Sequence, residues 1–180
     1  MYSKAENIAV LKNEAVQILI GVGLLACCSQ ISIPLQPIPI TMQSVAVLLI
    51  GLFYSQKTAI KTVLAYLAVG AMGAPVFSCM GAGVIHFLKP SAGFLFGFLA
   101  AVALMTYVRD RIQKETFLTQ LLCCTLGTVA LFAVGVSWLA CQIGIEKAIM
   151  VGFVPFIVPG IVKGLIVAAA CKHIKATRWA

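Results

Sequence analysis

Residues 148–171 read AIMVGFVPFIVPGIVKGLIVAAAC, and Lys163 carries the only charge in these 24 residues. An apolar run of this length predicts a helix that crosses a membrane. An ammonium group within hydrocarbon costs about 3 kcal/mol or more unless it meets an anion or water, so Lys163 is a candidate binding or gating residue. The alternative is a structural lysine that reaches the headgroups or donates to a backbone carbonyl.

The composition of the whole chain is that of a membrane protein. Of its 180 residues, 62% are hydrophobic and 10% are charged, and the mean hydropathy is +1.07. Water-soluble proteins carry about 25% charged residues. The surface left over here would be one large apolar patch, which makes sense only against lipid. The first apolar run follows mixed charges and ends without a small-residue cleavage pattern, so we expect a membrane helix there rather than a secretory signal.

Proline, glycine and charge clusters divide the chain into apolar segments that we expect to be helices. Two of them are shorter than the roughly 20 residues of a perpendicular span. We therefore predict an all-α integral membrane protein: a single membrane domain over residues 1–180, folded as a six-transmembrane-helix bundle with apolar outer loops over a substrate pocket. The predicted helices are roughly 14–31, 41–54, 58–73, 91–108, 117–143 and 147–172.

The basic residues predict the orientation of this bundle. With the amino terminus inside, ten of the thirteen lysines and arginines fall on the cytoplasmic side, as the positive-inside rule expects. Both termini are then cytoplasmic. The net charge of +8 is explained by topology, and no basic patch for nucleic acid is present. The ten residues are Lys4, Lys12, Lys57, Lys61, Arg109, Arg111, Lys114, Lys172, Lys175 and Arg178.

Two outer loops are apolar, which is unusual for solvated connections. Three prolines make residues 32–40 extended, and Thr41 is expected to cap the helix that follows. The second loop, around residues 74–91, is longer than ordinary connections, which favours a functional role. Irregular backbone at membrane depth must pack on protein or line a cavity, so both loops are expected to fold onto the bundle and cover a pocket. A structural plug is the alternative.

Five stretches together resemble the BioY family, the biotin-specific substrate-binding subunits of energy-coupling factor (ECF) transporters. They run in the family's order along roughly residues 15–170. They are ISIPLQPIPITMQS (Ile31–Ser44), GAMGAPVF (Gly70–Phe77), KPSAGFLFGF (Lys89–Phe98), GVSWL (Gly135–Leu139) and PFIVPGIVKGLIVA (Pro155–Ala168).

The resemblance implies a six-helix bundle in a bacterial cytoplasmic membrane that captures biotin at its outer face. A separate module of two ATPases and a transmembrane coupling protein would drive it, and no cofactor is expected. Biotin has an apolar bicycle, a ureido group and a carboxylate, which call for aromatic walls, polar contacts and a cation. The candidate binding residues are Lys163, Gln36, Gln43, Phe77, Met80, Gly81, Lys89, Ser91, Gly93, Phe94, Trp138 and Gly160.

The sequence departs from the family pattern at three polar positions. Gly160 stands where members often have an aspartate, Gly81 where an asparagine is common, and Leu95 where some have an arginine. Lys163 remains without its nearest expected counter-ion. We expect the ligand carboxylate or ureido oxygen to complete its coordination, with polar contacts from Gln36, Gln43 and Ser91 and with Lys89 at the rim.

A coupling partner would need a surface of small residues, which allow close approach of helices. Gly21, Gly23 and Cys27 in the first helix are candidates for this partner interface. Small residues also serve packing within one chain, so that alternative stays open. The basic loop at residues 107–115 could meet a partner or anionic lipid.

Other chemistries lack their residues. No GxxxxGK[ST] motif occurs, and the five carboxylates lie at termini or in loops, which weakens a proton-coupled carrier. His86 and His173 are expected at the surface, and the cysteines are expected to be apolar filler, so neither a metal site nor an enzyme is predicted. Two alternatives remain for transport: a solitary biotin carrier, or a secondary transporter or channel for another small molecule.

Overall fold

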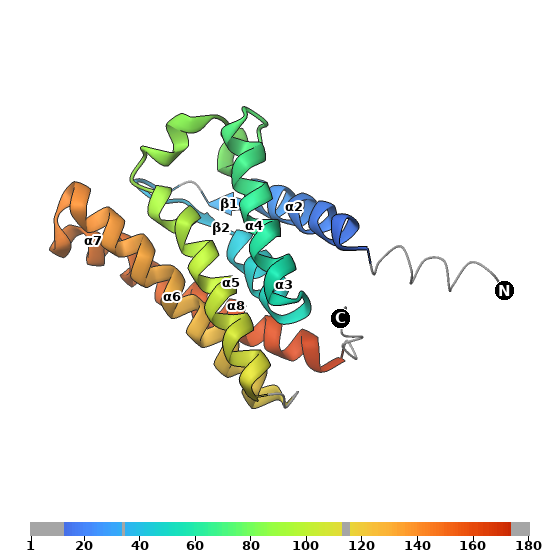
Figure 1. Ribbon diagram of the computed structural model, residues 1–180. Helices are drawn as coiled ribbons and strands as arrows, with labels where there is room; N and C mark the ends of the chain where they lie inside the picture. The colour runs from blue at the N-terminus through green and yellow to red at the C-terminus, as the bar shows by residue number, and fades with distance from the viewer. Residues whose placement is uncertain (1–12, 34, 113–115, 174–180) are drawn as a thin grey trace.

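The computed structural model describes residues 13–33, 35–112 and 116–173, and over these residues the chain is mostly helical (Figure 1). Two short 3-10 helices, η1 (Ser78–Met80) and η2 (Val84–Phe87), lie between α4 and α5. Two short strands, β1 (Ser32–Ile33) and β2 (Ile40–Thr41), precede α3. The α-helices are α2 (Glu14–Gln30), α3 (Gln43–Phe53), α4 (Gln56–Ala71), α5 (Ala92–Ile112), α6 (Phe117–Ile143), α7 (Ile145–Gly152) and α8 (Val154–His173).

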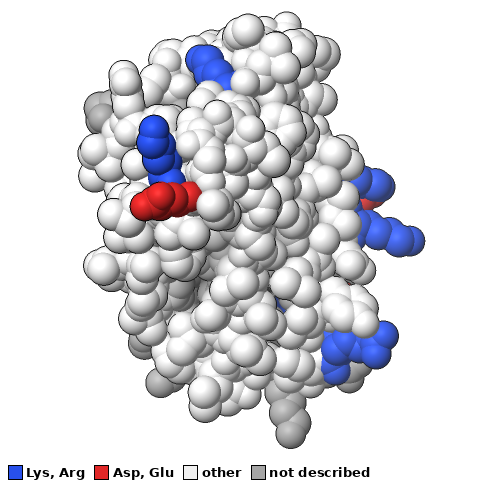
Figure 2. Space-filling model, turned by 90° about the vertical axis from the view of Figure 1, so that its left-hand side faces the viewer, with Lys and Arg blue, Asp and Glu red and all other residues white. Residues whose placement is uncertain are grey.

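Three of the described helices, α5, α6 and α8, are long and apolar enough to cross a membrane. Helices α2 and α3 are apolar but shorter. Figure 2 shows a face that is mostly uncharged, with a few charged side chains in small groups, one of them a basic side chain beside an acidic one. The protein is therefore a multi-pass membrane protein. The count of six spans stays a prediction, as does the orientation, because Lys4, Lys12, Lys114, Lys175 and Arg178 lie outside the described residues.

The predicted segment 117–143 coincides with α6, and the first four segments match α2 to α5 within about four residues. The segment 147–172 is different, because it is two helices, α7 and α8, that meet at Phe153. Pro155 explains the break: it has no N–H to donate to the carbonyl of Val151, and its ring would clash there if one helix continued. Because of this break, the direction of α8 is not set by that of α7.

The helices pack as two connected groups (Figure 1). Helix α2 lies against α3 and α4, while α5 packs along α6, and α8 contacts both α6 and α3. The side chain of Met105 in α5 is fully buried between two glycines. A Cβ on Gly51 of α3 would lie 2.9 Å from the Met105 sulfur, and a Cβ on Gly127 of α6 would overlap it. The two glycines therefore let α3 and α6 approach α5 closely.

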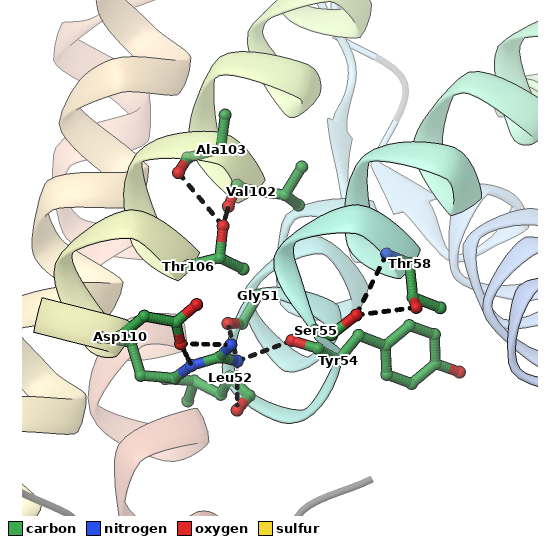
Figure 3. A network of polar contacts seen from close by, with 10 residues as sticks. Gly51, Leu52, Tyr54, Ser55, Thr58, Val102, Ala103, Thr106 and Asp110 are labelled. Atoms are coloured by element: carbon green, nitrogen blue, oxygen red, sulfur yellow. Dashed lines mark hydrogen bonds and ion pairs between the residues drawn. The ribbon is translucent and has the colours of Figure 1, made fainter. Parts of the chain in front are cut away.

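Arg109 of α5 fixes the C-terminal end of α3. Its Nη1 donates to the carbonyl oxygens of Gly51 at 2.9 Å, Leu52 at 3.0 Å and Tyr54 at 2.7 Å (Figure 3). The last carbonyls of a helix have no partner within the helix, and a cation is favoured at that end by the helix dipole. The position of α3 is thereby set from α5.

The proline-rich loop forms a small antiparallel hairpin, with Ser32 opposite Thr41 and Ile33 opposite Ile40. The expected cap is wrong: Met42 is the N-cap of α3 and makes no side-chain cap bond. Thr41 instead belongs to β2 and uses its hydroxyl to donate to Oε1 of Gln43 at 3.2 Å. The prediction that both loops fold onto the bundle is confirmed, because Ile38 and Phe77 are 4% and 2% exposed.

Candidate functional site

A cavity of about 80 Å³ lies where the two loops meet α3, α5, α6 and α8. The loop residues 77–87, here called the lid, supply part of its wall. Polar side chains gather from the start of α3, the lid and α8, whereas α5 and α6 supply mainly apolar ones. The lining residues are Ile38, Pro39, Thr41, Gln43, Ser44, Phe77, Ser78, His86, Ser91, Phe94, Leu95, Phe98, Leu131, Phe132, Phe156 and Lys163.

Lys163 of α8 points into this cavity. Its Nζ donates to the carbonyl oxygen of Thr41 at 2.6 Å and to Oγ of Ser44 at 3.0 Å. Among the described residues the ion pairs are Lys61–Glu14 and Arg109–Asp110, so Lys163 has a carbonyl and a hydroxyl as partners but no carboxylate. The lysine therefore does not reach for headgroups, although the backbone carbonyl partner considered above is present. Within the described ranges, no acidic side chain therefore balances the charge of Lys163.

The N-terminal end of α3, beside Lys163, is a second source of positive potential in the cavity. Helix α3 begins at Gln43, next to the lysine's two partners. The first N–H groups of a helix lack partners within it and carry the positive end of the helix dipole. A cation is disfavoured at that end, while a carboxylate is favoured. The ammonium group and the helix N-terminus therefore converge on one place suited to an anion.

Three phenylalanines from three helices form an aromatic wall opposite the polar groups. The rings of Phe94 and Phe156 are stacked with centroids 6.1 Å apart, and Phe132 meets them edge-on at 6.1 Å and 5.9 Å. They come from α5, α8 and α6. Rings at this spacing pack favourably with one another and give a rigid apolar surface.

A chain of hydrogen bonds runs from the cavity wall into the bundle. Nε2 of Gln43 donates to the hydroxyl of Tyr66, which donates to the carbonyl oxygen of Val76 at 2.9 Å. The hydroxyl of Ser29 reaches the same carbonyl at 2.7 Å. Tyr66 and Ser29 are fully buried. Because buried polar groups with satisfied bonds are costly to rearrange, Gln43 is held in one orientation.

The lid is attached to α2 and α4 by two further contacts. Gln30, the last residue of α2, donates from Nε2 to the carbonyl oxygen of Phe77 at 3.1 Å and accepts from the backbone N–H of Met80 at 3.0 Å. The ring of Phe77 packs where a Cβ on Gly70 would overlap it. The amide and the ring together fix the first half of the lid.

Five of the predicted binding residues line the cavity: Lys163, Gln43, Phe77, Ser91 and Phe94. Their side chains come from the start of α3, the lid and helices α5 and α8, up to 120 positions apart between Gln43 and Lys163. The fold therefore brings this part of the predicted set together.

The other predicted binding residues do not line this cavity. Gln36 is exposed between β1 and β2, and Met80 is 66% exposed. Gly93 packs against Trp138, whose Nε1 donates to the carbonyl oxygen of Lys89 at 3.3 Å.

The remaining two are glycines. Gly81 packs against the ring of His86. Gly160 lines a smaller cavity of about 30 Å³ next to the first, together with Ser44 and Lys163. Both therefore adjoin residues of the main cavity without lining it.

Several lining residues were not predicted from the sequence. Thr41 was assigned only a capping role and Ser44 no role, and the apolar helices gave no sign that Phe98, Phe132 and Phe156 face inward. His86 was expected at the surface, and this is wrong: its side chain is half-buried and lines the cavity. The polar residues at the start of α3, close together in an apolar chain, were the signal that could have found Thr41 and Ser44.

The small residues of α2 divide between two faces. A Cβ on Gly21 would overlap Cγ2 of Thr62 in α4, so Gly21 serves packing within the chain. Within the part of the chain that the structure describes, no other element lies within 4 Å of a Cβ on Gly23, and Cys27 is exposed. These two residues, one turn apart, leave an uncovered face. Among the described residues, no group of three His, Cys, Asp or Glu could hold a metal ion.

Comparisons with known proteins agree with this fold. A probable biotin transporter BioY of Rickettsia prowazekii is 35% identical over 162 residues, which cover 90% of this chain and 83% of the relative. A biotin transporter BioY of Thermotoga maritima is 36% identical over 154 residues, 85% of this chain and 90% of the relative. The crystal structure of an S-component for biotin from an ECF-type ABC transporter matches with a TM-score of 0.79 at 21% identity, covering 96% of this chain and 93% of that one, and shares the fold.

The relatives are transporters rather than enzymes. The family model of the BioY family matches residues 3–179, nearly the whole sequence. The resemblance carried by the five stretches is thus confirmed, and the chain belongs to the BioY family.

Proposed function

We propose that this protein binds biotin at the cavity and delivers it across a bacterial cytoplasmic membrane as the substrate-binding component of an ECF transporter. The ATP would be hydrolysed by two partner subunits and the motion transmitted by a transmembrane coupling subunit. The observation that carries the proposal is Lys163, a half-buried cation without a carboxylate partner among the described residues, placed at the N-terminus of α3 inside an aromatic-walled cavity.

The cavity has the chemistry that biotin requires. The carboxylate would meet the Lys163 ammonium and the first N–H groups of α3. The apolar bicycle would lie against Phe94, Phe132 and Phe156. The side-chain amide of Gln43 and the hydroxyl of Ser91 line the same cavity and would contact the ureido group. A membrane protein with this arrangement would discriminate against cations and against neutral analogues that lack the carboxylate.

The cavity must widen to admit this ligand. Its volume of about 80 Å³ is below the roughly 300–1,000 Å³ of ordinary small-molecule pockets. The lid and the hairpin contain no α-helix, and Gly83, with φ at +86°, separates the two short 3-10 helices of the lid. We therefore expect the lid, rather than the helices, to move when biotin enters.

Equilibrium binding of radiolabelled biotin to the purified protein tests the proposal, with unlabelled vitamins as competitors. Biotin should displace the label and other vitamins should not. Lys163→Met keeps an apolar stem and removes the charge, and it should weaken binding about 10- to 100-fold, because a hydrogen bond to a charged group contributes about 1.5–3 kcal/mol.

The matched control is Lys147→Met, which changes an exposed lysine of α7. It should leave biotin affinity unchanged. Biotin binding that is equally strong in Lys163→Met and in the unmodified protein would reject the assigned role of Lys163, and no biotin binding at all would reject the function.

A transport assay separates the partner-dependent reading from the alternatives. We expect uptake only when the ATPase and coupling subunits are present. Uptake by the chain alone, down its gradient, would indicate a solitary carrier. Uptake that follows a proton or sodium gradient would indicate a secondary transporter. The six-helix topology with both termini in the cytoplasm belongs to the same proposal.

A further inference from the structure

His86 is a titratable side chain of the cavity to which the proposed function assigns no role. It belongs to η2 in the lid and lines the same cavity as Lys163, which enters from α8. Its ring lies against Phe77, with centroids 5.4 Å apart and planes tilted by 39°. Phe77 is itself 2% exposed and seated against Gly70. The imidazole is therefore backed by a fixed part of the lid.

Gly81 provides the space for this ring. A Cβ on Gly81 would overlap Cε1 of His86 and lie 2.6 Å from its Nε2. The backbone at Gly81 has φ −68° and ψ 145°, an extended conformation that any residue adopts. Glycine is therefore not required there by the backbone. It is required by the imidazole, and the two residues form one structural pair.

The contact with Lys89 favours a neutral imidazole ring. Its Nζ lies 3.3 Å from Nε2 of His86. An ammonium group can only donate, so Nε2 is the acceptor and the ring is neutral with its proton on Nδ1. A lowered pKa of His86, caused first by burial and then by the Lys89 charge, agrees with a neutral ring. The lid therefore offers an N–H donor at Nδ1 of His86.

We propose that His86 is a ligand-binding residue, whose Nδ1–H donates to an acceptor oxygen of the molecule held by Lys163. The inference rests on the proposed function, and it adds a second polar contact from the lid. Biotin has acceptor oxygens at both of its ends, the carboxylate and the ureido carbonyl. With Lys163 on the carboxylate, the donor in the lid takes the ureido oxygen and closes the lid over the bound ligand.

Binding of radiolabelled biotin to four variants of the full-length protein tests this proposal. His86→Ala should weaken binding about 5- to 20-fold, the effect of losing one hydrogen bond. His86→Asn places an amide N–H near the position of Nδ1, so it should restore most of the affinity. Gly81→Ala should weaken binding by displacing the ring. In the His86→Ala background, Gly81→Ala should have no further effect.

Ile85→Ala is the matched control, because Ile85 is a neighbour in η2 that is 60% exposed and does not line the cavity. It should bind biotin as the unmodified protein does. Competition with biotin methyl ester separates His86 from Lys163. The preference for biotin over its ester should persist in His86→Ala and disappear in Lys163→Met.

Three results would overturn the inference. Unchanged affinity in His86→Ala, with biotin still bound by the unmodified protein, would reject His86 while leaving the proposed function intact. An equal effect of Gly81→Ala with and without His86 would show that the glycine acts through something other than the imidazole. No biotin binding by the unmodified protein would reject both proposals together. Monodisperse elution of each variant from size-exclusion chromatography establishes that a loss of binding is not a loss of folding.

Discussion

Two cations touch opposite ends of α3, and they have opposite consequences. Arg109 lies at the C-terminal end, where the helix dipole favours a cation by about 0.3–1 kcal/mol and the last carbonyls need donors. Lys163 lies at the N-terminal end, where the dipole disfavours a cation by a similar amount. Arg109 is thus explained by the fold alone. Lys163 is held against the dipole by hydrogen bonds to the Thr41 carbonyl and the Ser44 hydroxyl, neither of which balances its charge.

Arg109→Met should therefore lower stability. The change leaves the carbonyls of Gly51, Leu52 and Tyr54 without their donor at a part-buried site, and we expect the free energy of unfolding to fall by about 2 kcal/mol. Thermal unfolding in detergent measures this. Arg111→Met is the control, because the guanidinium of Arg111 lies 5.0 Å from the centroid of the Tyr107 ring and forms no ion pair among the described residues. Equal melting temperatures for the two variants would contradict the capping role.

Acidification should destabilise the lid through His86. Burial, followed by the charge of Lys89, lowers the pKa of His86 below its usual value of 6.5. Between 6.5 and the lower pKa the unfolded chain binds a proton that the folded protein does not, so stability is present above about pH 6.5 and is lost as the pH falls through this window. Lys163 is the other titratable side chain that lines the same cavity.

Melting temperatures at pH 7.5, 6.5 and 5.5 measure this dependence. His86→Asn removes the titrating group, so its melting temperature should fall less between pH 7.5 and 5.5 than that of the unmodified protein. Parallel curves for the two proteins would show that His86 does not titrate differently in the folded state.

At the scale of elements, the sequence predicted helices better than it predicted their inward faces. The range 117–143 was predicted to the residue, because one apolar run is bounded by charged residues before it and by Gly144 after it. The break between α7 and α8 was missed although Pro155 was visible, since prolines are tolerated within membrane helices. Phe132 and Phe156 were missed because a helix that is apolar all round gives no sign of which face is buried.

The uncovered face of α2 leads to a prediction about the coupling partner. Gly23→Leu adds bulk at a place where, among the described residues, no other part of the fold lies within 4 Å of a Cβ. Biotin binding by the purified protein should be unchanged, whereas ATP-driven uptake should be largely lost, because a partner helix could no longer approach closely.

Ala169→Leu is the control for this change, since Ala169 is an exposed small residue on α8. It should leave uptake intact. Normal uptake with Gly23→Leu would show that the partner docks on another surface, and a loss of biotin binding would show that the added bulk disturbs the fold itself.

At the scale of the whole molecule, the lid and the loop between α3 and α4 should lie on opposite sides of the membrane. Cys79 is exposed in η1, and Lys57 is exposed near the start of α4. In intact cells, a membrane-impermeant maleimide should label a variant whose only cysteine is Cys79. A variant whose only cysteine comes from Lys57→Cys should be labelled only after the membrane is permeabilised. The reverse pattern would invert the predicted orientation.

The site itself could be predicted only in part, because it is assembled from distant segments. Lys163 was evident as a lone charge in an apolar run, and the family motifs indicated Phe77, Ser91 and Phe94. Gly81 was included among the candidate binding residues because it stands where an asparagine is common in the family. Its meaning depends on His86, five residues away in the sequence but in contact through the turn of the lid. Such a steric relation is visible only once the chain is folded.

Helix α2 takes part in two tasks at once. Gln30 ties its end to the backbone of Phe77 and Met80, while Gly23 and Cys27, one to two turns earlier, lie bare on its flank. If the lid moves, either these two hydrogen bonds break or α2 tilts together with the lid. In the second case, ligand entry would displace the uncovered face of α2, where a coupling subunit would bind. The change would reach that face through α2 itself and would not have to pass through the centre of the protein.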